Sequence, residues 1–374
     1  MGAVDVIILH PSPGPDAGLL GSALADARVI VADRQRAGFL AIGAASARVV
    51  SEAPDGRPFG ARLREARTAV RPGRGLVLLG SGALPLATAA DRRRFVVAAA
   101  AATPGALANN RYSADAVALS APAVDLLDGL PDAFPGDNAL PRWLAEVGGV
   151  PVRDLRRSWR LAVDLDSPLD VLLVAMGARP RIGALDGVVK AIGAERVRSR
   201  IEAIGDVLGD PRAELLVAGR TSTATIGWLE SHARCRVRAV VEERGLRAST
   251  DLAVASAGSA ATVRRHPPRR RRPPRSVLGM VLERDGPAAL GPRLAELADA
   301  ALVDSRVLLA DRLGVDEALW PRPETRYASD LLDADGVDDA WLAALTRSAT
   351  DAAIPVLLGG HTLVGPGLRL VAAT

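Results

Sequence analysis

An apolar run that ends in a glycine turn decides the fold class: Gly75-Leu-Val-Leu-Leu-Gly80-Ser81-Gly82. The run is apolar without alternation, which is typical of a strand that is buried on both faces, and the glycine turn ends it. One face of an amphipathic helix precedes the run and consists of Phe59, Leu63, Ala66 and Val70. A buried strand next to an amphipathic helix is the repeating unit of an α/β fold.

The same alternation of strand and helix patterns continues along the chain. We expect further strands at Val4–Leu9, Asp115–Leu119, Leu161–Asp164, Glu214–Ala218, Cys235–Val241, Ala301–Val303 and Pro355–Leu358. We expect helices at residues 89–102, 137–146, 168–175 and 197–208, after residue 222, and near residues 291–300 and 338–349. This order predicts sheets with helices on both faces. A chain of 374 residues favours two domains, and the interruption at residues 177–187 divides them into residues 1–177 and 188–374.

Composition limits the classes of protein that fit. The hydrophobic fraction of 49% and the charged fraction of 24% are those of a globular protein and exclude a disordered or fibrous chain. The longest apolar run, Phe95–Ala102, is far shorter than the ~20 residues of a membrane helix, and the N-terminus shows no secretory signal pattern. A single cysteine, Cys235, fits a reducing compartment. We therefore expect a cytoplasmic protein without a membrane partner.

The basic residues are almost all arginine, and Lys190 is the single lysine. This bias indicates a GC-rich bacterium. The net charge is only +4, so a nucleic-acid partner is disfavoured. One segment, residues 249–275, concentrates arginines between prolines. Because proline removes backbone donors and like charges repel, we expect a disordered basic insertion there; the alternative is a tether that grips phosphate or RNA.

The most informative stretch for chemistry is Arg160-Leu-Ala-Val-Asp164-Leu-Asp166-Ser167-Pro168-Leu-Asp170. Ser167 fits the N-cap of a helix, Pro168 fits the first helical position, and Asp170 completes a capping box. Asp164 and Asp166 lie on one side of an extended chain, because side chains repeat every second residue. Two carboxylates at the end of a strand suit Mg²⁺ that carries nucleotide phosphates. In the alternative, Asp166 is only a turn residue.

Four segments, in order, resemble a family of small nucleotidyltransferases. The stretch from Asp164 to Asp170 resembles the D-(I/L)-D-(T/S)-P-x-D signature that ends their catalytic domain. Residues 75–86 resemble a strand and its A-D-L-P-L turn, residues 109–115 fall on a substrate-facing Gly-Gly-Thr-Asn-like loop, and residues 134–139 fall on an F-G-P-G-S-F stretch. The resemblance covers residues 1–176. It is to the 2-phospholactate/phosphoenolpyruvate guanylyltransferases and, more distantly, to the molybdenum cofactor guanylyltransferases.

The resemblance implies a nucleotidyltransferase-like (GT-A/Rossmann-like) N-terminal domain with a mixed sheet. It also implies Mg²⁺-dependent transfer of a nucleotide, GTP or CTP, to a small phosphorylated acid, with Asp164 and Asp166 as catalytic metal ligands. The residues that it places against the nucleotide or substrate are Ser81, Gly82, Asn109, Asn110, Arg111, Ser113, Asp137 and Asn138. His10 precedes Pro11 at the end of a predicted strand, and we expect it to face the same pocket. The chain departs from the family at Ala83, where the family has a metal-binding aspartate, and at residues 10–19, which lack the family's lysine and arginine.

The C-terminal half, expected to be a smaller Rossmann-like domain, offers a second group of polar residues at predicted strand ends. They are Arg220, Thr221, Glu243, Arg244, Asp304, Arg306 and His361. Ligands bind outside the carboxyl ends of strands in open α/β sheets, so these residues predict a pocket; the alternative is that each is a turn residue or a surface ion. Three functions stay open: a nucleotidyltransferase, a nucleotide- or phosphometabolite-binding protein on a degenerate transferase scaffold, and an enzyme with its active site in the C-terminal half. A homodimer also stays open.

Overall fold

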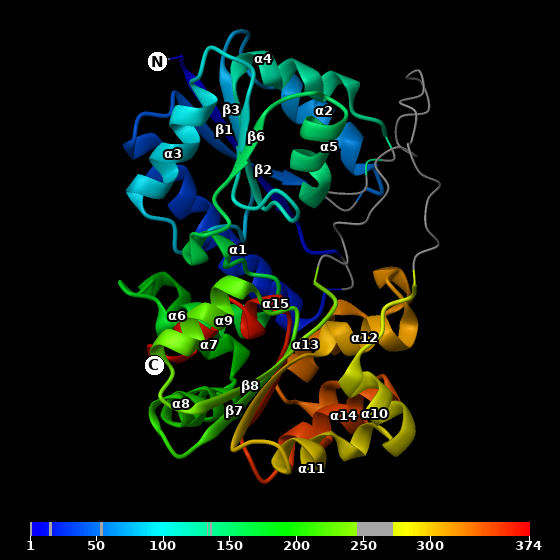
Figure 1. Ribbon diagram of the computed structural model, residues 1–374. Helices are drawn as coiled ribbons and strands as arrows, with labels where there is room; N and C mark the ends of the chain where they lie inside the picture. The colour runs from blue at the N-terminus through cyan, green and yellow to red at the C-terminus, as the bar shows by residue number, and fades with distance from the viewer. Residues whose placement is uncertain (1, 15–16, 53–54, 133, 135–136, 245–271) are drawn as a thin grey trace. The chain divides into compact units, whose positions relative to one another are not determined.

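The computed structural model describes residues 2–14, 17–52, 55–132, 134, 137–244 and 272–374. The chain forms two compact units (Figure 1). Of the described residues, those within 1–12 and 31–162, together with 272 and 273, form the N-terminal unit, and those within 13–30, 163–244 and 274–374 form the C-terminal unit. Residues 163–177, expected in the first domain, therefore belong to the C-terminal unit.

Six strands form the sheet of the N-terminal unit: β1 (Val4–Pro11), β2 (Ser46–Glu52), β3 (Gly75–Gly80), β4 (Ala106–Ala108), β5 (Ala116–Leu119) and β6 (Val152–Asp154). Their order is β2-β1-β3-β5-β4-β6, and β5 is antiparallel to both of its neighbours while the other pairs are parallel. The helices are α1 (Leu19–Ala41), α2 (Phe59–Thr68), α3 (Ala89–Ala99), α4 (Ala121–Val124) and α5 (Leu140–Glu146). The first part of α1, through Ile30, belongs to the C-terminal unit.

Alternate residues of the central strands of this sheet face two hydrophobic cores. Ile7 and Leu76 pack in one core with the buried side chains of α2, α4 and α5. Ile8 and Val77 pack in the other core with Phe95 of α3. Figure 1 shows α3 on one side of β1 and β3, with α2 and α5 on the other. The uninterrupted apolar run of β3 is thus explained by burial on both faces.

Four parallel strands form the sheet of the C-terminal unit: β7 (Glu214–Gly219), β8 (Arg236–Val241), β9 (Ala300–Asp304) and β10 (Val356–Gly359). Their order is β10-β9-β7-β8. The helices are α6 (Pro168–Gly177), α7 (Asp186–Ile192), α8 (Glu195–Gly209), α9 (Thr223–His232), α10 (Val277–Asp285), α11 (Leu290–Ala295), α12 (Ser305–Leu313), α13 (Pro323–Asp330), α14 (Ala340–Thr350), α15 (His361–Val364) and α16 (Leu368–Val371). Helices cover both sides of this sheet, as Figure 1 shows.

The predicted α/β class, with a mixed sheet and a smaller second sheet, is confirmed. The predicted strand Leu161–Asp164 is wrong, because Trp159–Ala162 forms a 3-10 helix instead. Leu161, Val163 and Leu165 are all buried, so their alternation reflects burial of an irregular segment and not pairing in a sheet. Within the described ranges, no helix is long and apolar enough to cross a membrane.

Two local predictions concern the ends of helices. The capping box of α6 is confirmed, since Ser167 Oγ accepts from the Asp170 N–H at 3.4 Å and Asp170 Oδ2 accepts from the Ser167 N–H at 2.8 Å. Residues 249–271 of the basic insertion lie outside the described residues. The prediction that the chain is unpacked as far as residue 275 is wrong for the last two residues. Pro274 is buried, and the Arg275 guanidinium lies 3.3 Å from the Asp311 carboxylate.

Candidate functional site

The carboxyl ends of the four strands of the C-terminal sheet lie at one edge, because the strands are parallel. β7 has the next strand of the chain, β8, on one side and β9 on the other. The connections after β7 therefore diverge there, which makes this a topological switch point, the usual place for a ligand in an open α/β sheet. We call the segments that end β7, β9 and β10 (residues 219–222, 304–306 and 359–361) the C-terminal edge.

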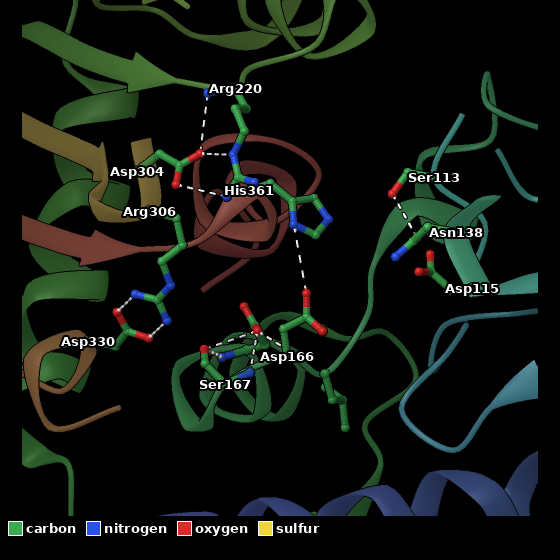
Figure 2. Close-up of polar contacts among 12 residues, drawn as sticks. Ser113, Asp115, Asn138, Asp166, Ser167, Arg220, Asp304, Arg306, Asp330 and His361 are labelled. Atoms are coloured by element: carbon green, nitrogen blue, oxygen red, sulfur yellow. Dashed lines mark hydrogen bonds and ion pairs between the residues drawn. The ribbon is translucent and has the colours of Figure 1, made fainter. Parts of the chain in front are cut away.

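An ion pair between Arg220 and Asp304 joins the ends of β7 and β9 (Figure 2). Arg220 Nε donates to Asp304 Oδ2 at 2.6 Å, and Arg220 Nη2 donates to Oδ1 at 3.0 Å. The Asp304 side chain is fully buried, whereas that of Arg220 is 23% exposed. Gly219 permits this close approach, because its φ is +129° and a Cβ there would lie 2.2 Å from Asp304 Cβ. The pair holds a partly exposed guanidinium at the switch point.

A second ion pair, between Arg306 and Asp330, lies deeper in the unit (Figure 2). Arg306 Nη1 donates to Asp330 Oδ1 at 2.5 Å and Nη2 donates to Oδ2 at 2.6 Å, while Nη1 also donates to Ser305 Oγ at 2.9 Å. Burial acts against the charged form of Arg306, but the charge and hydrogen bonds of Asp330 outweigh it and raise the pKa of Arg306. The Arg306 side chain is only 13% exposed, so Arg306 is a largely buried cation and not the surface ion of the alternative interpretation.

Asp170 is a buried carboxyl group beside these pairs. Its Oδ2 accepts from the N–H groups of Asp166 and Ser167 at 3.0 and 2.8 Å, while its Oδ1 is buried without a hydrogen-bond partner in the part of the chain that the structure describes. Burial, and then the charges of Asp166 and Asp330, raise the pKa of Asp170 from 3.8 to about 8. A neutral Asp170 leaves the carboxylates of Asp304 and Asp330 to balance the two guanidinium groups.

More exposed polar groups surround Asp166, which precedes α6. Asp166 Oδ1 lies 3.9 Å from Arg28 Nη2, and Asp166 Oδ2 lies 3.9 Å from His361 Nδ1. Arg28 is held by a hydrogen bond from its Nε to the Leu165 carbonyl at 2.8 Å. Figure 2 shows His361, from the end of β10, facing Asp166. The side chains of His361 and Asp166 are 42% and 55% exposed, so both can reach a bound ligand.

The predicted magnesium ligands are Asp164 and Asp166, and a metal site on this pair stays a prediction. Asp166 lies beside two groups that carry or can carry positive charge, Arg28 and His361, which compete with a cation for its oxygens. Among the described residues, no group of three or more acidic, histidine or cysteine side chains could hold a metal ion. Mg²⁺ prefers six oxygen ligands, so we derive no metal-dependent step here and Mg²⁺ stays a prediction.

Of the remaining predicted residues of the C-terminal half, Thr221 and Glu243 have structural contacts. Thr221 is fully buried, and its Oγ1 donates to the Val364 carbonyl at 2.9 Å. Glu243 Oε1 accepts from the Arg275 N–H at 3.0 Å. Arg244 is exposed. Thr221 thus ties α15 to the end of β7, and Glu243 ties the end of β8 to the start of α10.

The N-terminal unit has a switch point of its own, between β1 and β3, because β2 lies on the other side of β1. His10 is the last residue but one of β1, and Ser81 follows β3. His10 Nδ1 and Ser81 Oγ share a hydrogen bond at 3.0 Å. Both residues are buried, and so is Gly82. The structure therefore brings together three residues that the sequence analysis assigned to nucleotide binding.

The Asn109 side chain stabilises the predicted substrate loop through four hydrogen bonds. Its Oδ1 accepts from the N–H groups of Asp115 and Ala116 at 3.0 and 3.1 Å, and its Nδ2 donates to Asp115 Oδ2 at 2.8 Å and to the Leu161 carbonyl at 2.9 Å. The Asn109 amide is thereby fully engaged within the unit. Further along the loop, Ser113 Oγ donates to Asn138 Oδ1 at 3.0 Å, a contact that Figure 2 also shows.

Three other predicted residues belong to the same region of the chain. Asn110 Oδ1 accepts from the Tyr112 N–H at 3.1 Å, Arg111 is half-buried, and Asp137 begins a 3-10 helix that ends at Ala139. Residues 109–113 belong to the N-terminal unit, whereas Asp164 and Asp166 belong to the C-terminal unit. The expected meeting of these two groups around a nucleotide stays a prediction.

Ala83, which stands where the resembled family has an aspartate, is 1% exposed. Its carbonyl accepts from Gln35 Nε2 at 3.1 Å, and the next residue, Leu84, has a φ of +57° and also accepts from Gln35 at 2.5 Å. The turn after β3 is therefore a buried, uncharged structure. An aspartate at this position would need a partner that the present packing does not supply.

The sequence analysis did not assign Asp330 and Arg28 to the group of polar residues around the C-terminal edge. Asp330 ends α13, and Arg28 lies in α1, far from the other members in sequence. Neither belongs to a motif, so no sequence signal could have found them. Asp170 was noticed only as a helix cap, because its burial beside other carboxylates is a property of packing.

Comparison of the chain with models of known protein families gives no match, and neither do comparisons with curated proteins or with solved structures.

Proposed function

We propose that the C-terminal unit binds a small phosphorylated metabolite or a nucleotide at the C-terminal edge, with Arg220 as the receptor for its phosphate. The observation that carries this proposal is the anchoring of Arg220 on the buried Asp304 at the switch point. Asp304 engages Nε and Nη2 of the guanidinium, while Nη1 has no partner within the described ranges. A guanidinium that is held in this way keeps donors for a phosphate.

The helices at this edge favour the same ligand chemistry. α9 begins after the turn that carries Arg220, with Ser222 as its N-cap, and α12 begins directly after Asp304. Backbone N–H groups at helix N-termini attract anions, and these two helices follow the two strands of the switch point. His361 and Asp166, both partly exposed, are the residues that could contact the rest of the ligand.

Isothermal titration with inorganic phosphate, phosphoenolpyruvate, GTP and CTP tests this proposal. Arg220→Ala should weaken binding at least about tenfold, because a charge-assisted hydrogen bond is lost. Arg220→Lys should bind more tightly than Arg220→Ala, because lysine keeps the positive charge but cannot make the two-point contact of a guanidinium. Arg212→Ala, at an arginine with an 89% exposed side chain in the same unit, is the matched control. Unchanged affinity of a folded Arg220→Ala variant would refute the proposal.

Nucleotidyl transfer is the second candidate, and the arrangement at β1 and β3 favours it. His10, Ser81 and Gly82 lie together at the switch point of a mixed sheet, and Ser81 and Gly82 belong to a segment that resembles the guanylyltransferases. Under the binding proposal we expect no pyrophosphate release at enzymatic rates, about 1 per second or faster, from GTP or CTP with Mg²⁺ and phosphoenolpyruvate or phospholactate. Release at such a rate, abolished by Asp164→Asn, would replace the binding proposal by the transferase.

A further inference from the structure

A cavity of about 510 Å³ lies in the C-terminal unit, among the end of α6, α7 and the start of α8. This volume is in the range of sites for small organic ligands. None of the residues that line the cavity belongs to the C-terminal edge. The cavity is therefore a place separate from the site proposed above and does not involve Arg220.

The lining combines an apolar wall with charged groups. Ala175 and Met176 of α6 and Val189 of α7 supply the apolar part. The charged part consists of four cationic and three anionic side chains, Arg179, Arg181, Lys190, Arg198, Asp186, Glu195 and Glu202. These seven side chains sum to one positive charge, and the three carboxylates among them would repel a dianion more strongly than a monoanion.

Most of these cations already have partners. Arg181 Nη2 lies 2.8 Å from Asp186 Oδ1, and Arg198 Nε lies 3.6 Å from Glu195 Oε2. Arg179 Nη1 donates to the carbonyls of Met176 and Ala178 at 2.8 and 3.0 Å. Lys190, on the last turn of α7, is different: its ammonium has no hydrogen bond or ion pair with any residue that the structure describes.

Lys190 is also the only lysine in a chain with 47 basic residues. An ammonium group is a compact point charge on a flexible stem, whereas a guanidinium prefers planar, two-point contacts. We propose that this cavity binds a small organic carboxylate with an apolar chain, with the carboxylate on the Lys190 ammonium and the chain against Met176 and Val189.

Titration with hexanoate, hexylamine and inorganic phosphate tests the proposal. The wild type should bind hexanoate more tightly than either of the other two probes. Lys190→Ala should weaken hexanoate binding about tenfold, and Lys190→Arg should weaken it less, because it keeps the charge at the end of α7. Met176→Ser should weaken hexanoate binding and leave the binding of acetate unchanged.

Two controls separate this site from the one at the C-terminal edge. Arg212→Ala and Arg220→Ala should both bind hexanoate as the wild type does, so a failure of the phosphate proposal leaves this one standing. Equal hexanoate affinity of the wild type and Lys190→Ala would overturn the proposal. So would preference for phosphate or for hexylamine over hexanoate.

Discussion

The two units share the same local topology and differ in what stands at their switch points. In the N-terminal unit the order β2-β1-β3 places His10 and Ser81 together, and in the C-terminal unit the order β8-β7-β9 places Arg220 and Asp304 together. The first pair is a hydrogen bond between buried side chains, and the second is an ion pair backed by further buried charges. Topology alone thus selects the place of a site, and side chains decide its chemistry.

The two switch points are also stabilised by different kinds of interaction. Around Ser81 the contacts are hydrogen bonds of uncharged groups, such as those from Gln35 to the carbonyls of Ala83 and Leu84. Around Asp304 the contacts are between buried ions, for which loss of one partner is costly. Matched substitutions in the two units should therefore have very different consequences.

The largest effect is expected for Asp330→Asn. This change leaves the Arg306 guanidinium buried without its carboxylate partner, so the free energy of unfolding should fall by about 3–5 kcal/mol. Asp335→Asn, at an ion pair in which both side chains are largely exposed, should change stability little. Chemical denaturation of both variants measures this contrast, and equal effects would mean that the Arg306–Asp330 pair is not buried in solution.

The next largest effect is expected in the pH dependence of the free energy of unfolding, through the ionisation of Asp170. In the unfolded chain this carboxyl ionises near 3.8, and in the folded protein near 8. Between these values the folded state holds a proton that the unfolded state has lost, so the contribution of Asp170 to stability falls as the pH rises and is constant above about pH 8.

The loss is at most about 1.4 kcal/mol per pH unit. Asp170→Asn, which cannot ionise, should gain stability relative to the wild type as the pH is raised from about 5 to 8. Denaturation curves at several pH values measure this difference. A difference that stays constant over this range would show that Asp170 is ionised throughout.

A somewhat smaller effect is expected for the glycines that end two strands, one in each unit. Gly219→Ala should destabilise the protein by about 2–3 kcal/mol, because of its positive φ and the contact with Asp304 Cβ. At Gly80, the end of β3, an added Cβ meets nothing within 4 Å, so Gly80→Ala should be close to neutral. The melting temperatures of the two variants, each compared with the wild type, measure this difference. An unchanged melting temperature of Gly219→Ala would contradict the close packing of β7 against Asp304.

The smallest effect is expected at the N-terminal switch point. Ser81→Ala removes one uncharged hydrogen bond to His10, which should lower stability by about 1 kcal/mol. Ser51→Ala, at an exposed position on β2, is its control and should change nothing. A loss at Ser81 as large as that at Asp330 would erase the contrast between the two switch points.

Much of the fold follows from the sequence, since β3 is apolar throughout, β7 is apolar after Glu214, and both strands end at glycines. The capping box of α6 could also be predicted, because Ser167 and Asp170 are local signals. The error at Leu161–Asp164 has a physical cause: an irregular segment that buries every second residue has the same pattern as a strand.

The residues of the candidate site could be predicted only in part from the sequence. Arg220, Asp304, Arg306 and His361 follow strands, and parallel strands bring their ends to one edge, so the sequence could gather them. The ion-pair partners could not be assigned, because Asp330 ends a helix and its approach to Arg306 depends on tertiary packing. The raised pKa of Asp170 depends on the same packing.

Hydrogen–deuterium exchange with and without GTP, and with and without phosphoenolpyruvate, tests the central claim most directly, because it reports on both switch points at once. The account predicts that a bound ligand slows exchange of the amides in the turn after β7 and at the start of α12, and leaves unchanged the turn after β3 and the loop at residues 109–115. Slower exchange confined to the turn after β3 and that loop would contradict it and would assign the ligand to the N-terminal unit.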